Sequence, residues 1–332
     1  MLATLAVAAT ALVAPTATVS TAGRPARGRA PGPRAASTAG SQAAVQALMQ
    51  RHDPILLYVS RVLSDDMAQD AGALYAWCRR LDQIVDEPES SDPATTRLAL
   101  DDWAARLDRL CDGDPADEMD AALTETLERH PTLSRGLFAD MIAGMRSDVE
   151  ERRRIKDYAE LELYAYQVAG TVGLMLLPLL GLSSEAQAAP ARAPAVALGQ
   201  AVQLINILRD ARPDAAMGRI YLPADEMAAL GVSEDDVLGR RATPEYRQLV
   251  ARTAARAEAL LLEAERGAPT LPGLGPLLAQ TIVELYRDYL VELARRGHDN
   301  LSDGGERVKV GTARKLGSTL RAAVRLLRGP PP

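Results

Sequence analysis

Apolar residues recur every three or four positions from Gln42 to Arg328, which covers most of the chain. This spacing matches one face of an α-helix, and no convincing run of alternating β-branched residues favours a strand. Clusters of glycine and proline divide the pattern into about ten helical segments. We predict an all-α body in a single domain, because neither a repeat of fixed period nor a second composition zone divides it.

The composition excludes several classes of protein. The chain has 332 residues, of which 47% are hydrophobic and 25% charged, so it can bury a sizeable core. Its formal net charge of −6, without a basic stripe, argues against nucleic-acid binding. Cys78 and Cys111 are too few for a disulfide framework, which indicates a reducing compartment. The apolar run 168–182 is too short for a membrane span and contains Pro178, so we expect a buried helix.

The first 41 residues differ from the rest of the chain. Residues 1–20 are uncharged, residues 21–41 contain four arginines, and no acidic residue precedes Asp53. This composition is typical of a plastid or mitochondrial transit peptide, with a signal-like first half as in a two-part leader. A disordered native tail is the alternative. We predict a plastid-targeting leader over 1–41, a helical domain over 42–328 and a tail over 329–332.

One predicted helix carries a phenol, a guanidinium and two carboxylates on a single face. Tyr75, Arg79, Asp82 and Asp86 follow one another at steps of three and four residues. Carboxylates four residues apart repel each other unless a cation offsets their charge. Mg²⁺ is suited to this, because it prefers oxygen ligands and bridges carboxylates to phosphates. Taken alone, the pair is more often a solvated surface face.

A second helix repeats this arrangement with Gln203, Asn206, Asp210 and Asp214. The apolar residues Leu204, Ile205, Ile207 and Leu208 surround Asn206, which suggests a buried helix whose carboxylates face a cavity. Buried carboxylates without partners are unstable unless a cation or a proton neutralises them. Because both acid pairs lie beside arginines, we predict that they share a metal cluster that holds a diphosphate.

These segments resemble the squalene and phytoene synthase family, and most closely the plant and algal type of phytoene synthase. The resemblance lies in YAWCRRLDQIVDEP (75–88), DMIAGMRSDVE (140–150), ELYAYQVAGTVGLM (162–175) and QLINILRDARPDAAMGRIYLP (203–223). It implies an isoprenoid-synthase-type helical bundle around a central active-site cavity. It further implies head-to-head condensation of two geranylgeranyl diphosphates to 15-cis-phytoene through a cyclopropyl diphosphate, the first committed step of carotenoid biosynthesis. The implied cofactor is Mg²⁺, with Mn²⁺ as an alternative and without NADPH.

The resemblance assigns roles to individual side chains. The implied metal ligands are Asp82, Asp86, Asn206, Asp210 and Asp214. The implied contacts to substrate or diphosphate are Tyr75, Arg79, Gln203, Asn206, Arg209 and Arg219. Tyr164 matches a tyrosine near the proton-transfer step, although a buried phenol is more often an ordinary core residue. Asp148 is expected to support the site, with a surface ion pair as the alternative.

The chain departs from the family pattern at three places. Ile55-Leu56-Leu57 replaces a stretch that usually supplies a hydroxyl near the diphosphate. Val202 stands where asparagine is usual, and Pro213 where glutamate is usual. Because both acid pairs are kept, we expect activity, with an altered affinity or substrate chain length as the consequence.

Three other functions compete with this interpretation. A squalene synthase would use farnesyl diphosphate and NADPH, but it usually ends in a membrane helix. A non-catalytic relative that serves as a respiratory-complex assembly factor would have lost the acidic motifs, which this chain keeps. A purely structural helical scaffold would leave both acid pairs unexplained.

The C-terminal residues 312–328 form a basic amphipathic pattern. Its apolar members are Leu316, Leu320 and Leu327, and its basic members are Arg314, Lys315, Arg321 and Arg325. We predict peripheral contact with an anionic membrane, with a bundle helix whose basic face is solvated as the alternative. The expected partners are the geranylgeranyl diphosphate substrate, other isoprenoid or carotenoid enzymes and the plastid membrane.

Overall fold

The computed structural model describes residues 33–52, 64–87, 92–149 and 153–302, together with 307–311, 314, 317–318, 320–322 and 324–325. The predicted leader up to residue 32, Ile55 to Leu57 and the tail 329–332 lie outside these residues. Helix α2 (Pro33–His52) already begins before Gln42. The proposed domain boundaries stay a prediction.

The described chain is helical, which confirms the all-α prediction. After α2 follow α4 (Asp65–Asp86), α5 (Pro93–Cys111), α6 (Glu118–Arg129), α7 (Arg135–Ser147), α8 (Tyr158–Ala165), the π-helical turn η1 (Tyr166–Gly170), α9 (Thr171–Leu179), α10 (Glu185–Ala216), α11 (Ala224–Leu230), α12 (Glu234–Leu238), α13 (Pro244–Gly267), the short η2 (Ala268–Thr270) and α14 (Gly275–Arg295). None of the helices in these ranges is both long and apolar enough to cross a bilayer.

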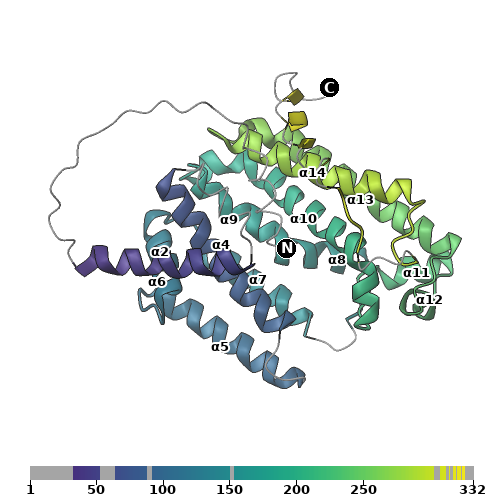
Figure 1. The fold of residues 1–332 in the computed structure, drawn as a ribbon, viewed down its shortest axis with the longest axis horizontal. Helices are drawn as coiled ribbons and strands as arrows, with labels where there is room; N and C mark the ends of the chain where they lie inside the picture. Colours follow the sequence, from purple (N-terminus) through teal and green to yellow (C-terminus); the bar gives the residue numbers. More distant parts are fainter. Residues whose placement is uncertain are drawn as a thin grey trace.

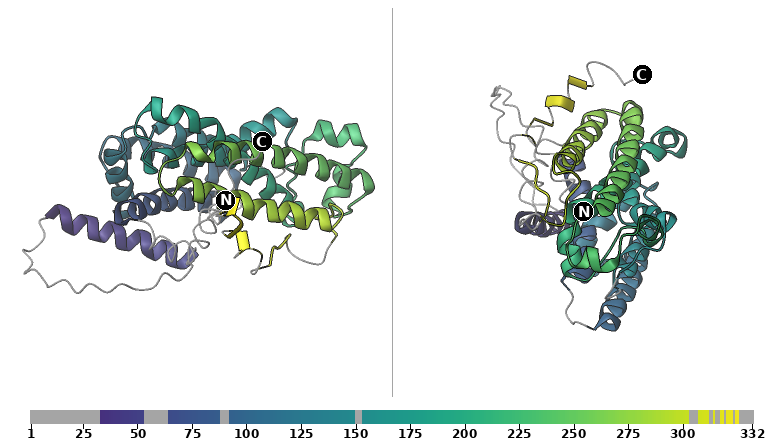
Figure 2. Two further views of the ribbon diagram at one scale, coloured as in Figure 1. Left: turned by 90° about the horizontal axis from the view of Figure 1, so that it is seen from above. Right: turned by 90° about the vertical axis from the view of Figure 1, so that its right-hand side faces the viewer.

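Helix α10 runs through the middle of the bundle (Figure 1). It packs against η1 and α9 on one side and against α13 and α14 on another. Helix α2 lies at one end of the bundle, and α11 and α12 lie at the opposite end (Figures 1 and 2). The second acid pair lies at the C-terminal end of α10, where both carboxylates are partly buried.

Helix α4 carries the first acid pair and is anchored by its apolar face. Ser64 caps its N-terminus, where its side chain accepts from the N–H of Met67. Trp77 is buried and meets the ring of Phe138 edge-on, with centroids 4.8 Å apart. Buried aromatic pairs of this geometry contribute about 0.5–1.5 kcal/mol beyond their area. The core contacts thus fix the rotation of α4 and the direction of its acids.

Two glycines let the backbones of η1 and α9 touch α10. A Cβ added to Gly199 would lie 2.3 Å from the carbonyl oxygen of Ala169, and one added to Gly173 would lie 2.3 Å from that of Ala195. Contacts this close exclude any side chain. The π-helical turn lies at the same crossing, as is frequent at functional sites. This crossing sets the position of Tyr164, just before η1, relative to α10.

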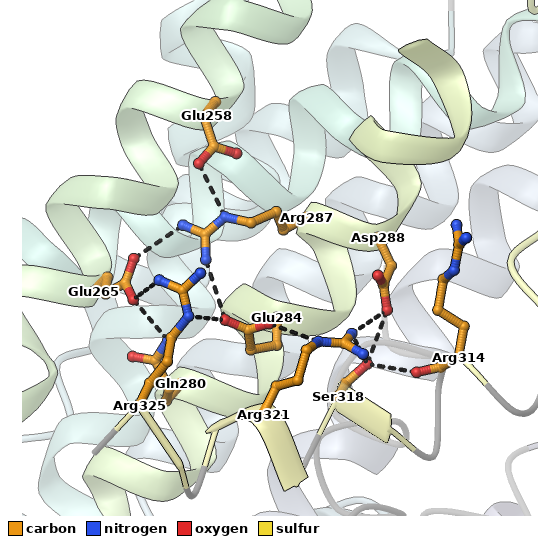
Figure 3. Close-up of polar contacts among 10 residues, drawn as sticks. All are labelled: Glu258, Glu265, Gln280, Glu284, Arg287, Asp288, Arg314, Ser318, Arg321 and Arg325. Atoms are coloured by element: carbon orange, nitrogen blue, oxygen red, sulfur yellow. Dashed lines mark hydrogen bonds and ion pairs between the residues drawn. The ribbon is translucent and has the colours of Figure 1, made fainter. Parts of the chain in front are cut away.

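The C-terminal segment is held by ion pairs that we call the C-terminal arginine cluster (Figure 3). Its members are Glu258, Glu265, Glu284, Arg287, Asp288, Arg321 and Arg325. Arg321 Nε lies 2.9 Å from Glu284, and Arg325 Nη1 lies 2.7 Å from Glu265.

The orientation of this segment differs from the predicted one. Its described arginines Arg314, Arg321 and Arg325 pair with acids of α13 and α14, whereas Leu320 is 70% exposed and Val324 36% exposed. The physical reason is that Glu265 and Glu284 are buried and require counter-charges. Contact of this segment with a membrane stays a prediction.

Candidate active site

The first acid pair lies at the C-terminal end of α4. Asp82 is buried and Asp86 is exposed. The pKa of Asp82 is raised to about 6, mainly by burial and also by the charges of Asp86 and Asp148, while Arg79 opposes the shift. Carboxylates at a helix C-terminus also face the negative end of its dipole. The pair is therefore unfavourable for the fold by itself, and an added cation would relieve it.

The second acid pair lies near the end of α10. Arg209 Nε donates to Asp210 over 2.9 Å, and the guanidinium of Arg307 lies 3.5 Å from the same carboxylate. The pKa of Asp214 is raised to about 7, mainly by burial and also by the charges of Asp210 and Asp148, while Arg219 opposes the shift. Arg307, which is about half exposed, was missed by the sequence analysis because it lies far from both motifs.

Asp148 and Arg219 link the two acid pairs. The charge of Asp148 raises the pKa of both Asp82 and Asp214. Burial lowers the pKa of Arg219, but the charges of Asp148, Asp86 and Asp214 outweigh this effect and leave that pKa raised. Charge interactions therefore couple Asp82 of α4 and Asp214 of α10 to Asp148, the C-cap residue of α7, and the shared metal cluster stays a prediction. Asp148 is buried, which argues against the alternative of a surface ion pair, and its support of the site stays a prediction.

Two tyrosines donate to the carboxylate of Asp148. Tyr164 is bonded to Oδ2 at 2.6 Å and Tyr221 to Oδ1 at 3.1 Å. Burial raises the pKa of Asp148 to about 6 even though both hydroxyl groups and the charges of Arg219 and Arg153 act to lower it. Tyr221 was missed by the sequence analysis, although its place two residues after Arg219 could have indicated it.

Several buried donors have room for a further acceptor. Within the described chain, Arg79 Nε, Asn206 Nδ2 and Arg153 Nε have no hydrogen-bond partner. Arg79 Nη2 donates to Glu87 over 3.1 Å, and Asn206 Oδ1 accepts from Tyr286 at 3.4 Å. Unpaired buried donors are costly. An anionic ligand that contacted Arg79 and Asn206 would satisfy them.

The remaining predicted residues lie inside the bundle. Tyr75 is fully buried on α4, and Gln203 is partly buried on α10. Val202, one of the departures, is a buried core residue. The roles of Tyr75 and Gln203 stay predictions.

The acid pairs fit Mg²⁺ in one particular binding mode. Among the described residues, no three acidic, histidine or cysteine side chains are grouped so as to hold a metal ion by themselves. Mg²⁺ commonly takes only one or two carboxylates and completes its shell with water and substrate phosphates. The ionised forms of Asp82 and Asp214 are unfavourable in their surroundings, because burial and neighbouring acids raise the pKa of both. The site therefore suits a cation that arrives together with a diphosphate.

Comparison with known proteins points to one family. The family model described as squalene/phytoene synthase matches residues 49–314. Phytoene synthase 3, chloroplastic, of Zea mays is 42% identical over 257 residues, which cover 77% of this chain and 59% of the maize protein. Phytoene synthase 2, chloroplastic, of Solanum lycopersicum is 40% identical over 245 residues, which cover 73% of this chain and 77% of the tomato protein.

Solved structures share the fold. A dehydrosqualene synthase in complex with a ligand matches with a TM-score of 0.77 at 28% identity, covering 89% of this chain and 99% of that one. The prediction of an isoprenoid-synthase-type helical fold is thereby confirmed. The chain spans about 59 to 61% of the length of the maize and melon relatives.

Proposed function

Because the chain belongs to the squalene/phytoene synthase family, we propose that it condenses two geranylgeranyl diphosphates head to head into 15-cis-phytoene. The observation that carries the proposal is a buried donor next to each acid pair that has no partner among the residues the structure describes, Arg79 Nε on α4 and Asn206 Nδ2 on α10. The identity of about 40% with plant proteins named phytoene synthases supports this activity over others of the family.

The residues of the site fall into two groups: acids that would bind the metal ion and arginines that would contact the diphosphate. Asp82, Asp86, Asp210 and Asp214 would hold Mg²⁺, or alternatively Mn²⁺, with Asn206 as a further ligand. When bound, the ion stabilises the negative charge of the departing pyrophosphate. Arg79 and Arg219 contact the diphosphate. Arg209 and Arg307 both contact the carboxylate of Asp210, and their guanidinium groups would also contact the diphosphate of a bound substrate.

The reaction begins with ionisation of one allylic diphosphate. The double bond of the second substrate attacks the cation, and loss of a proton near Tyr164 closes the cyclopropyl diphosphate. A second ionisation and rearrangement end in another proton loss, so that no NADPH is consumed. The apolar residues of η1 and α9 keep water from the cations, since 168–179 is almost entirely apolar and mostly buried.

The location of the enzyme is part of the same proposal. The maize and tomato relatives are named chloroplastic, which supports a plastid leader in this chain. The exposed Leu320 and Val324 supply an apolar contact for peripheral binding to a membrane. Other isoprenoid or carotenoid enzymes would then supply substrate and take product at that surface.

The activity is tested with a chain that starts at Pro33. A start at Ser41 would cut α2, in which Ser41 is buried. The protein is incubated with geranylgeranyl diphosphate and Mg²⁺, and in parallel with farnesyl diphosphate and NADPH. We expect phytoene in the first reaction and its loss after chelation of the metal. Squalene in the second reaction without a C40 product in the first would refute the proposal.

Single substitutions test the acid pairs. Asp82→Ala and Asp210→Ala are expected to abolish turnover while the helical content by circular dichroism stays unchanged. Asp101→Ala is the matched control, because Asp101 is an exposed acid that pairs with Arg146 away from the site. Retained turnover in both site variants would remove the metal-binding assignment.

A further inference from the structure

The carboxylate of Asp148 is clamped between two phenols. Each of its oxygens accepts one hydroxyl hydrogen bond, from Tyr164 at 2.6 Å and from Tyr221 at 3.1 Å. The two rings stack with centroids 5.5 Å apart and an interplanar angle of 22°. All three side chains are buried. Neither carboxylate oxygen can move without breaking one of these bonds.

The three residues come from segments far apart in the sequence. Asp148 follows α7, Tyr164 lies in α8 and Tyr221 follows α10. The segment before Tyr221 is tied down by the N–H of Ile220, which donates to the carbonyl of Arg153 at 3.0 Å. Tyr221 is thus fixed by the backbone on one side and by the stacked ring on the other. It is a rigid support for Asp148.

Tyr221 and Tyr164 differ in what they can do. Tyr164 matches the family's tyrosine near the proton-transfer step. The hydroxyl of Tyr221 donates its proton to the other oxygen of Asp148, Oδ1. A phenol whose own proton is shared with a carboxylate has an oxygen that accepts a further proton more readily. The proton affinity of the phenol oxygen therefore depends on the orientation of the carboxylate that accepts its hydrogen bond.

We infer that Tyr221 is a positioning residue for the proton-transfer step, holding Asp148 so that this carboxylate orients the Tyr164 hydroxyl. The inference rests on the proposed function. In the step, the proton lost by the substrate cation passes to the Tyr164 oxygen while the Tyr164 proton moves to Asp148 Oδ2. One proton enters and one leaves the phenol, and no electron is transferred.

The kinetic test compares Tyr221→Phe with Tyr246→Phe. Tyr246 is the matched control, because it is also buried and donates one hydrogen bond, to Asn300 at 2.8 Å, away from Asp148. We expect Tyr221→Phe to lower kcat about tenfold with KM unchanged, the effect of one hydrogen bond to a charged group. Tyr246→Phe should leave kcat unchanged.

The same substitution in an Asp148→Asn background separates positioning from general destabilisation. If Tyr221 acts through the carboxylate, adding Tyr221→Phe to Asp148→Asn lowers kcat no further. Independent losses that multiply would overturn the inference, as would a rise in KM that accounts for the whole effect.

A crystal structure of Tyr221→Phe gives a readout that does not depend on activity. We expect the carboxylate of Asp148 to rotate and the Tyr164 hydrogen bond to lengthen from 2.6 Å. An unchanged bond would overturn the inference. If the wild type makes no condensation product, the proposed function fails, and this structure still decides whether Tyr221 holds Asp148.

Discussion

The backbone N–H of Val308 donates a hydrogen bond of 3.1 Å to the carbonyl oxygen of Arg209. Inside an α-helix this carbonyl would accept from residue 213, but Pro213 has no N–H. The proline that departs from the family pattern therefore leaves an acceptor on α10, and the C-terminal segment satisfies it. This bond also places Arg307, the preceding residue, beside Asp210.

The stability that is lost when this donor is removed should depend on Pro213. We expect Val308→Pro to lower the free energy of unfolding by about 1 kcal/mol, because the Arg209 carbonyl loses its partner. In a Pro213→Ala background the N–H of residue 213 can bond to that carbonyl, so the same change costs less. Urea unfolding of the four variants measures the difference. Equal costs in both backgrounds would contradict the prediction.

The buried acids should make the metal-free protein less stable as the pH rises. The pKa of Asp82, about 6, and that of Asp214, about 7, lie above the value of 3.8 in an unfolded chain. The folded state therefore binds these protons more tightly, so its stability is full below about pH 4 and is lost as the pH rises through 6 to 7.

Replacing either buried acid by its neutral amide should remove the loss of stability at high pH. We expect Asp82→Asn and Asp214→Asn to be about 1–2 kcal/mol more stable than the wild type at about pH 8 and equal to it near pH 4. The measurement is urea unfolding in the presence of a chelator. Addition of Mg²⁺ with inorganic pyrophosphate should stabilise the wild type alone, and should therefore reduce the difference in free energy of unfolding between the wild type and the variants. If the difference in free energy of unfolding between variant and wild type did not change with pH, the charge of the acids would not be the cause of the lower stability.

Arg287 should matter more than Arg321 within the C-terminal arginine cluster. Arg287 is largely buried and bridges Glu258, Glu265 and Glu284, so Arg287→Ala leaves buried acids short of positive charge. We expect a loss of about 3–5 kcal/mol for Arg287→Ala. For Arg321→Ala, whose side chain is 41% exposed, we expect about 1 kcal/mol or less, weakened further by salt.

The measurement is thermal or urea unfolding at low and high ionic strength. Arg109→Ala serves as the reference, because Arg109 forms an exposed pair with Asp114. Similar losses for Arg287→Ala and Arg109→Ala would show that the cluster does not stabilise the fold.

Gly199→Ala should disturb the crossing of η1 and α10. Its Cβ would lie 2.3 Å from the carbonyl oxygen of Ala169, so the two backbones must separate. We expect a cost of about 1–3 kcal/mol and a lower kcat, because Tyr164 shifts relative to α10. Gly136→Ala is the control, since its Cβ would meet only the hydroxyl of Ser134 at 3.4 Å. A Gly199→Ala enzyme with normal stability and turnover would contradict this account.

The sequence by itself determined the helices and the faces of the two acid pairs. Helical periodicity is a local property, so the steps from Asp82 to Asp86 and from Asp210 to Asp214 already place each pair on one face. The motifs that surround the pairs were also local, and they were enough to identify the family.

Only the tertiary structure decided which distant residues meet. Tyr221 and Asp148 are 73 positions apart, and nothing in the local pattern of either predicts the bond between them. The orientation of Arg321 depends on acids of α14, and the partner of the Arg209 carbonyl is Val308. Amphipathic spacing shows which residues share a face. Which element covers that face depends on long-range packing, because buried charges and unpaired carbonyls take the partners that the fold brings near.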